Sequence, residues 1–238
     1  MMSIKENLAS VLEAIERART RSGRGDPVLL VGVSKTHPAS AVREAFAAGL
    51  KDFGENRIQE ALPKISEAAV PAVWHLVGHL QSNKAKKAAL SFDWIHSIDS
   101  FETAGIVART ASAVGRIVKI LLEVNTSGEA SKHGIPPEET LSLAESLAPL
   151  DGNGLLISGL MTVGPLGGDD TANRRAFAHL RSLRDRVQTI LPGCTELSMG
   201  MSGDFASAIL EGSTMVRVGS AIFGTRIAPE RYDAEHTE

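Results

Sequence analysis

The feature that most constrains the fold is a regular alternation of short apolar runs with segments of helical periodicity. Between the runs, apolar residues recur at helical spacing, as Phe177, Leu180, Leu183 and Val187 do. Eight strands that alternate with helices over about 200 residues predict a closed parallel (β/α)8 barrel of the TIM type, an α/β fold. The predicted strands are 28–34, 52–54, 73–77, 94–97, 119–124, 156–161, 196–199 and 215–219.

The alternative arrangement is a doubly wound open sheet, in which strands and helices also alternate. Its dinucleotide-binding members carry a Gly-x-Gly-x-x-Gly fingerprint in the first strand-to-helix turn. Here that turn reads Ser34-Lys35-Thr36-His37-Pro38. The sequence therefore favours the barrel.

An amphipathic helix is predicted before the first strand. Ser3 and Glu6 have the spacing of a capping box, and Leu8, Val11 and Ile15 follow at helical spacing. Because no linker or low-complexity segment interrupts the chain, we expect one domain over residues 1–238. Its expected parts are the helix within 1–24, the barrel at 28–226 and a polar tail at 227–238.

Charge and composition exclude several classes of function. The chain has 25 Lys and Arg against 28 Asp and Glu, and no basic block stands out, so nucleic acid is not an expected partner. No apolar stretch approaches the ~20 residues of a membrane span. Cys194 is the single cysteine, and the chain does not begin with a signal-type apolar run. We therefore expect a cytoplasmic location without disulfides.

Lys35 stands at the end of the first predicted strand, and strand ends that lead into helices form the active face of a barrel. The apolar run before it predicts an amine that has lost part of its hydration. Desolvation disfavours the ammonium ion and leaves neutral amine that attacks a carbonyl to form a Schiff base. The plainer interpretation is a strand-end lysine whose ammonium group reaches solvent.

Two clusters of glycines and hydroxyls follow the seventh and eighth predicted strands, at 198–204 and 217–226. Glycine lets backbone N–H groups approach an anion closely, and hydroxyls donate hydrogen bonds to it. Barrels often bind phosphate with these two loops. Two tight turns capped by Ser202 and Asp204 are the alternative interpretation.

One cofactor joins a reactive lysine to a phosphate site on the same barrel face, namely pyridoxal 5'-phosphate (PLP). The chain resembles the pyridoxal phosphate homeostasis proteins, also called the proline synthase co-transcribed bacterial homolog family, whose fold is the barrel of the alanine racemase N-terminal domain. The stretches that carry the resemblance span nearly the whole chain: VSK at 33–35, FGENRIQE at 53–60, HLVGHLQSNK at 75–84, HSID at 96–99, VN at 124–125, SKHG at 131–134, GLM at 159–161, LSMGMSGD at 197–204 and RVGSAIFG at 217–224.

The resemblance implies two principal contacts with the cofactor. Lys35 holds PLP as a Schiff base, the internal aldimine. Arg217 faces the pyridine nitrogen, and since a guanidinium does not give up its proton, that nitrogen stays unprotonated and the ring becomes a poorer electron sink. For Arg217, an ion pair inside the barrel is the alternative.

Other residues are assigned to the phosphate and to the ring by the same resemblance. Backbone N–H and hydroxyl groups hold the phosphate at Ser198, Met199, Gly219 and Ser220. Asn56 and Met161 lie at strand ends that approach the ring.

Three further side chains are candidates for a functional role. His75 and His79 are four residues apart, but no third ligand has suitable spacing, so no metal is expected and both are interpreted as local hydrogen-bond partners. Lys132, in the loop at 125–134, is interpreted as an exposed amine that competes for aldehydes, with an ordinary surface loop as the alternative.

The resemblance implies a role in PLP homeostasis: the protein binds PLP reversibly and supplies PLP-dependent enzymes. No catalytic residue is assigned, because the related racemases use a further β-domain for an acid–base residue, and the only tyrosine here, Tyr232, lies in the polar tail. Without that β-domain we expect a monomer. The alternatives are a racemase-like PLP enzyme, a Schiff-base aldolase and a module that acts through partner proteins.

Overall fold

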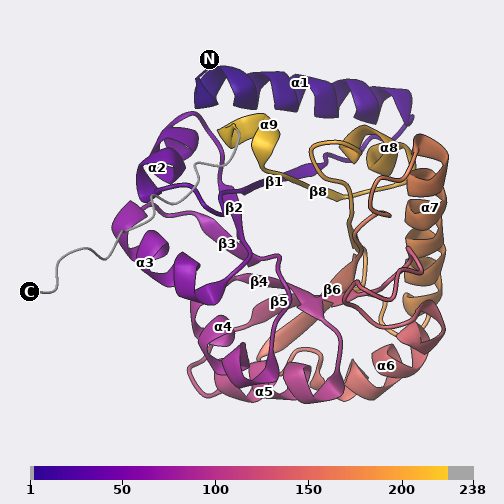
Figure 1. The fold of residues 1–238 in the computed structure, drawn as a ribbon. Coiled ribbons are helices and arrows are strands. Elements are labelled where there is room, and N and C mark those ends of the chain that lie inside the picture. Colours follow the sequence, from indigo (N-terminus) through magenta and orange to yellow (C-terminus); the bar gives the residue numbers. More distant parts are fainter. Residues whose placement is uncertain (1–2, 225–238) are drawn as a thin grey trace, which may run out of the picture.

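A closed barrel of parallel strands forms the centre of the molecule, as predicted (Figure 1). The computed structural model describes residues 3–224. Every neighbouring pair is parallel, and the last strand pairs with the first. The strands are β1 (Leu29–Val33), β2 (Asp52–Glu55), β3 (Val73–Leu76), β4 (Trp94–Ile98), β5 (Val118–Glu123), β6 (Leu155–Met161), β7 (Glu196–Ser198) and β8 (Met215–Val218).

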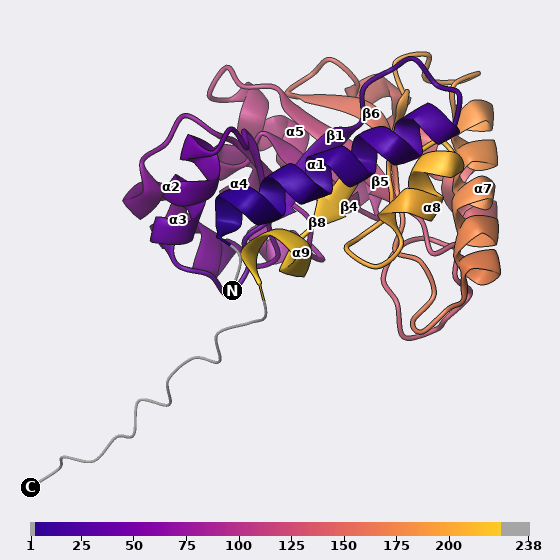
Figure 2. The same cartoon turned by 90° about the horizontal axis from the view of Figure 1, so that it is seen from above.

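Helices surround the barrel and connect consecutive strands (Figures 1 and 2). They are α1 (Ile4–Arg21), α2 (Ala39–Ala47), α3 (Ile58–Ala68), α4 (Ala85–Ser91), α5 (Phe101–Ser112), α6 (Thr140–Leu147), α7 (Asp170–Val187), α8 (Phe205–Leu210) and α9 (Ser220–Phe223), with short 3-10 helices η1 (Ser82–Lys84), η2 (Pro137–Glu139) and η3 (Ala148–Leu150).

The sequence located the strands closely: each predicted end lies within one residue of the observed one. The capping box at Ser3 and Glu6 is also confirmed, since each side chain bonds the other residue's backbone N–H. The predicted polar tail lies outside the described residues. Among those residues, no helix has the length and apolarity needed to cross a membrane.

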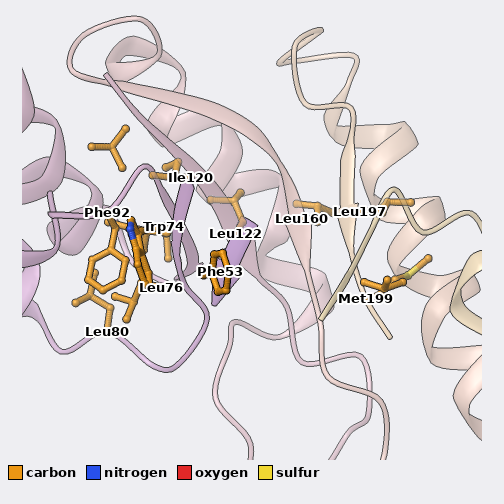
Figure 3. Close-up of a cluster of buried hydrophobic side chains, with 14 of the residues drawn as sticks. Phe53, Trp74, Leu76, Leu80, Phe92, Ile120, Leu122, Leu160, Leu197 and Met199 are labelled. Atoms are coloured by element: carbon orange, nitrogen blue, oxygen red, sulfur yellow. The ribbon is translucent and has the colours of Figure 1, made fainter. Parts of the chain in front are cut away.

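Most of the hydrophobic core lies between the strands and the helices. Figure 3 shows part of it, where Trp74 and Leu76 of β3 lie with Leu80 and Phe92. The ring of Phe53 of β2 packs against Trp74, with centroids 5.6 Å apart. A smaller cluster of Trp94, Leu121, Met161 and Met215 is separate from it. Because side chains alternate along a strand, one set faces the helices and the other fills the barrel.

The first helix packs against the last elements of the described chain. Figure 2 shows α1 alongside α8 and α9 on the outside of the barrel. The side-chain amide of Asn7 donates to the carbonyl oxygen of Ile222 at 3.0 Å. Together with the β1–β8 pairing, this contact joins the beginning of the fold to its end.

Candidate functional site

A cavity of about 510 Å³ lies at the carboxyl ends of the strands, where the barrel rule places active sites. Five predicted residues line it: Lys35, Asn56, Arg217, Gly219 and Ser220. The other three, Met161, Ser198 and Met199, are buried and do not appear in its wall. Residues of both predicted glycine–hydroxyl clusters line it too, since Met201, Ser202 and Gly203 belong to the cluster at 198–204. The structure therefore gathers the predicted amine, the predicted guanidinium and both predicted clusters at one cavity.

A second cavity, of about 700 Å³, is lined by residues near the amino-terminal ends of β1, β4, β7 and β8. Its wall includes Arg24, Trp94 and Glu196 and contains none of the predicted site residues. We take the cavity of about 510 Å³ as the candidate site because the predicted site residues line that cavity and not the larger one.

Lys35 follows β1 in a tight, strained turn. The next residue, Thr36, has φ of 65°, a left-handed conformation that a β-branched residue adopts at a cost of about 1–3 kcal/mol. The turn is held by the N–H of His37, which donates to Ser34 O, and by the N–H of Ser34, which donates to Gly54 O. Lys35 is half-buried, as expected for an amine at the rim of the barrel.

A buried ion pair supports this turn from behind. Lys64 of α3 donates to Glu55 Oε1 at 2.6 Å and to the carbonyl oxygen of Ser34 at 2.8 Å. The Ser34 hydroxyl donates to the same Glu55 oxygen at 2.6 Å. Since Ser34 immediately precedes Lys35, the pair fixes the backbone next to the amine that is predicted to form the Schiff base.

Arg217 of β8 is buried beneath the cavity and bonded to neutral oxygens. Its Nη1 donates to Ser198 O at 2.7 Å and to Ser198 Oγ at 2.6 Å, and its Nη2 donates to Thr162 O at 2.8 Å. No carboxylate of the described residues lies within ion-pair distance, so the alternative of an ion pair inside the barrel is not what the structure shows. Burial lowers the pKa of Arg217 to about 10, opposed by Glu123 and Asp204.

Glu123, at the end of β5, is a buried carboxyl group close enough to Arg217 to interact electrostatically. Burial raises its pKa to about 7, as does the charge of Asp99, while Arg217 acts in the opposite direction. Its Oε2 has no hydrogen-bond partner among the described residues. Near pH 7 this carboxyl group is therefore protonated in a substantial fraction of the molecules.

The turn after β8 offers donors to an anion. Gly219 lies so close to β1 that a Cβ atom would stand 3.1 Å from Val33 O, which brings this turn beside the end of β1. Its N–H donates to Ser202 Oγ at 3.3 Å, a long bond that links it to the loop after β7. The neighbouring Ser220 is exposed and lines the cavity.

The residues predicted just after and within β7 are engaged inside the protein. The Met199 N–H donates to Met215 O at 3.1 Å. The Ser198 hydroxyl contacts Arg217 and His96. In this conformation these two groups are therefore not directed to a ligand in the cavity, contrary to the expectation that they face the phosphate.

The two residues predicted near the ring differ in position. Asn56 lines the cavity, and its backbone lies against Gly78, where a Cβ would stand 2.3 Å from Asn56 O. Met161 is 1% exposed and packs in the small cluster with Trp94, Leu121 and Met215. Met161 thus supports the barrel interior without lining the cavity.

The structure agrees with the interpretation of His75 as a local hydrogen-bond partner and disagrees with that of Lys132 as an exposed amine. His75 is a buried hydrogen-bond partner of Asp52 and His96, and His79 stacks on His133. No group of His, Cys, Asp and Glu in residues 3–224 has the arrangement of a metal site. The interpretation of Lys132 as an exposed amine is wrong, because it is 18% exposed, pairs with Glu129 at 3.2 Å and donates to Gly164 O.

Sequence reasoning missed an ionisable residue of the cavity, His37. It is buried, lines the cavity and packs against the ring of Phe223. Burial lowers its pKa, as does the positive charge of Lys64. Its position two residues after Lys35 was the available signal.

Comparison with known proteins identifies the family of this chain. The family model of the alanine racemase N-terminal domain matches residues 7–227. A pyridoxal phosphate homeostasis protein of Pseudomonas aeruginosa is 45% identical over 229 residues, which are 95% of this chain and 97% of that protein.

Solved structures show the same relationship. PipY of Synechococcus elongatus superimposes with a TM-score of 0.84 without PLP and 0.81 with PLP bound, at 42% and 41% identity. In both cases the match covers 93% of this chain and 100% of that chain. Alanine racemase of Clostridium difficile shares the fold, with a TM-score of 0.72 at 15% identity over 94% of this chain and 58% of that one. The chain therefore belongs to the family of pyridoxal phosphate homeostasis proteins.

Proposed function

We propose that the chain binds PLP covalently through Lys35 and serves PLP homeostasis by holding and releasing the cofactor. The observation that carries the proposal is the 510 Å³ cavity, which joins the Lys35 amine, the Arg217 guanidinium and the turn at Gly219 and Ser220. The PLP-bound structure of PipY and the homeostasis name of the Pseudomonas relative support it.

The residues present fit this cofactor. A volume of about 510 Å³ lies within the ~300–1,000 Å³ typical of small-molecule sites. Arg217 uses three of its five N–H groups in the bonds described, which leaves two for a ligand. A buried cation without a paired carboxylate attracts an anionic ligand.

When bound, PLP supplies an aldehyde that condenses with a primary amine and releases water. Lys35 provides that amine, and the strained turn and the Lys64–Glu55 pair hold its backbone. Arg217 would hold the ring by directing an N–H at its nitrogen. The Ser220 hydroxyl would hold the phosphate together with the Gly219 N–H, which would exchange its long bond to Ser202 Oγ for the ligand.

The charges around the cavity favour a carrier over an amino-acid enzyme. An Arg217 N–H directed at the ring nitrogen would leave that nitrogen unprotonated, which would make the ring a weaker electron sink. Among the described residues of the wall, the remaining ionisable side chains are Lys35 and His37. Because burial lowers the pKa of His37, it stays neutral at pH 7.

Absorption spectra test the covalent attachment. Wild-type protein mixed with PLP should show a visible band that borohydride removes, and mass spectrometry should then place the reduced cofactor on Lys35. Lys35→Ala should lose the band, whereas Lys86→Ala, which changes an exposed lysine of α4, should keep it. An unchanged band in Lys35→Ala would disprove the proposal.

Kinetic measurements separate carrier from enzyme. We expect loaded protein to restore activity to a PLP-dependent apoenzyme and to exchange the α-proton of amino acids far more slowly than ~1 s⁻¹. Turnover at that rate would establish the racemase-like alternative. A borohydride adduct with a phosphorylated sugar, and none with PLP, would establish the aldolase.

A further inference from the structure

A line of polar side chains crosses the apolar interior of the barrel and ends at Arg217. Arg217 Nη1 donates to Ser198 Oγ at 2.6 Å, and Ser198 Oγ lies 2.9 Å from His96 Nδ1. His96 Nε2 lies 2.9 Å from His75 Nδ1, and His75 Nε2 lies 3.0 Å from Asp52 Oδ1.

The members come from separate strands, and the middle ones are wholly buried. Ser198, His96 and His75 are each 0% exposed, and Asp52, at the start of β2, is 17% exposed. Trp94 stacks on the His75 ring with an interplanar angle of 8°. Buried polar groups destabilise the fold unless each has a hydrogen-bond partner. Here every member of the line has one, and a fully bonded network of this kind holds its side chains in one arrangement.

The carboxylate end of the line fixes the direction of every proton in it, because a carboxylate only accepts. His75 therefore donates from Nε2 to Asp52, and its Nδ1 accepts from His96 Nε2–H. The bare Nδ1 of His96 then accepts from the Ser198 hydroxyl, whose oxygen accepts from Arg217.

The opposite direction fails for neutral rings. It would set the bare Nε2 of His75 against the Asp52 carboxylate, with two acceptors facing each other. A charged ring would remove that conflict, but burial lowers the pKa of His75 and lowers that of His96 well below its ordinary value.

We propose that Asp52, His75, His96 and Ser198 form a polar relay across the barrel that holds and orients Arg217 toward the cavity. Asp52 is the distal positioning residue. Its negative charge strengthens each bond in turn, because every donor in the line points toward it. The two neutral rings thereby join a half-buried anion to a buried cation without a direct ion pair.

Nitrogen NMR of the protein without PLP tests the direction of the relay. In histidine-labelled protein at pH 7, long-range ¹H–¹⁵N spectra should show both His75 and His96 neutral, with the proton on Nε2. A ring that carries its proton on Nδ1, or on both nitrogens, would overturn the proposal.

A matched pair of variants tests the reach of the relay. Asp52→Asn and Asp93→Asn each remove one charge that acts on His75, but Asp93 bonds to the Trp74 N–H and to Arg116 instead of to His75. Asp52→Asn should shift the His96 ring nitrogens and the Arg217 guanidinium protons, whereas Asp93→Asn should leave both in place. Equal shifts, or none, would disprove the relay.

Ser198→Ala breaks the line in the middle and serves as a second variant should Asp52→Asn fold poorly. It should shift the His96 Nδ1 signal, and an unchanged His96 spectrum would contradict the relay.

The part of the inference that concerns PLP rests on the proposed function. PLP affinity should fall about five- to tenfold in Asp52→Asn and not in Asp93→Asn. The NMR measurements need no cofactor, so a wild-type protein with the expected tautomers that fails to bind PLP would refute the proposed function and leave the relay intact. Equal PLP affinity in Asp52→Asn and wild type would refute the positioning role.

Discussion

Two buried cations support the cofactor cavity, and they differ in what compensates their charge. Lys64 is paired directly with Glu55 at 2.6 Å. Arg217 is bonded to the oxygens of Ser198 and Thr162, and the relay separates it from Asp52. The difference indicates a division of labour: Lys64 stabilises the scaffold, whereas Arg217 keeps a positive charge available to a ligand. The four predictions below test this division.

Removing the partner of Lys64 should have the largest effect on stability. Glu55→Ala leaves an ammonium group buried without its carboxylate, which costs about 3–5 kcal/mol in the free energy of unfolding. Chemical denaturation measures the change. The double variant Glu55→Leu/Lys64→Met should regain most of the loss, and a double variant as unstable as Glu55→Ala would show that the pair is not the cause.

Glu123 should make stability depend on pH in an unusual direction. Burial raises its pKa from 4.5 to about 7, so between these values the folded protein binds a proton that the unfolded chain has lost. Stability from this group is therefore present at low pH and declines as pH rises toward 7 and above, by roughly 3 kcal/mol in all.

The buried histidines change the stability in the opposite direction, because their lowered pKa values make the folded protein more stable as pH rises. Comparison of wild type with Glu123→Gln, which keeps these histidines, isolates the contribution of Glu123. From pH 5 to pH 8 the stability of Glu123→Gln should rise relative to wild type, as followed by denaturation. The exposed substitution Glu13→Gln should show no such trend. A parallel course for Glu123→Gln and wild type would mean that Glu123 is ionised throughout.

Arg217→Met should weaken PLP binding and cost less stability than Glu55→Ala. The variant removes a buried charge that has no paired carboxylate, so we expect a loss of only about 1–2 kcal/mol in stability, from the oxygens left without donors. PLP affinity should fall at least about tenfold, which corresponds to ~1.4 kcal/mol. Lys64→Met should show the reverse pattern. Titration calorimetry and denaturation on both variants give the comparison, and matching patterns would remove the distinction between the two cations.

The smallest loss of stability is expected for an exposed ion pair. Glu13 and Arg17 of α1 pair at 2.6 Å, as close as Lys64 and Glu55, but their side chains are 72% and 62% exposed. Glu13→Ala should cost only about 0.3–0.5 kcal/mol, because water screens the charges. A loss close to that of Glu55→Ala would show that burial does not set the scale.

The strands and the cavity-lining residues at their ends were predictable because local sequence encodes them. Strands buried on both faces appear as short apolar runs, and the barrel rule then places Lys35, Arg217 and Gly219 at one mouth. The Lys64–Glu55 pair was not predictable, since Lys64 looks like any polar position on a helix. The inward direction of Ser198 and its contact with His96 depend on strand register, which no local pattern specifies.

Because β1 pairs with β8, the barrel can close only after the last strand has been synthesised. Lys35 leaves the ribosome early, but Arg217 and the turn beside it are made 182 residues later. With the proposed roles of these residues, a nascent chain exposes the lysine of the Schiff base long before the phosphate-binding turn has been made. Retention of the vitamin-derived ligand is consequently a property of finished molecules, and a prematurely terminated product would carry the amine without the means to keep anything on it.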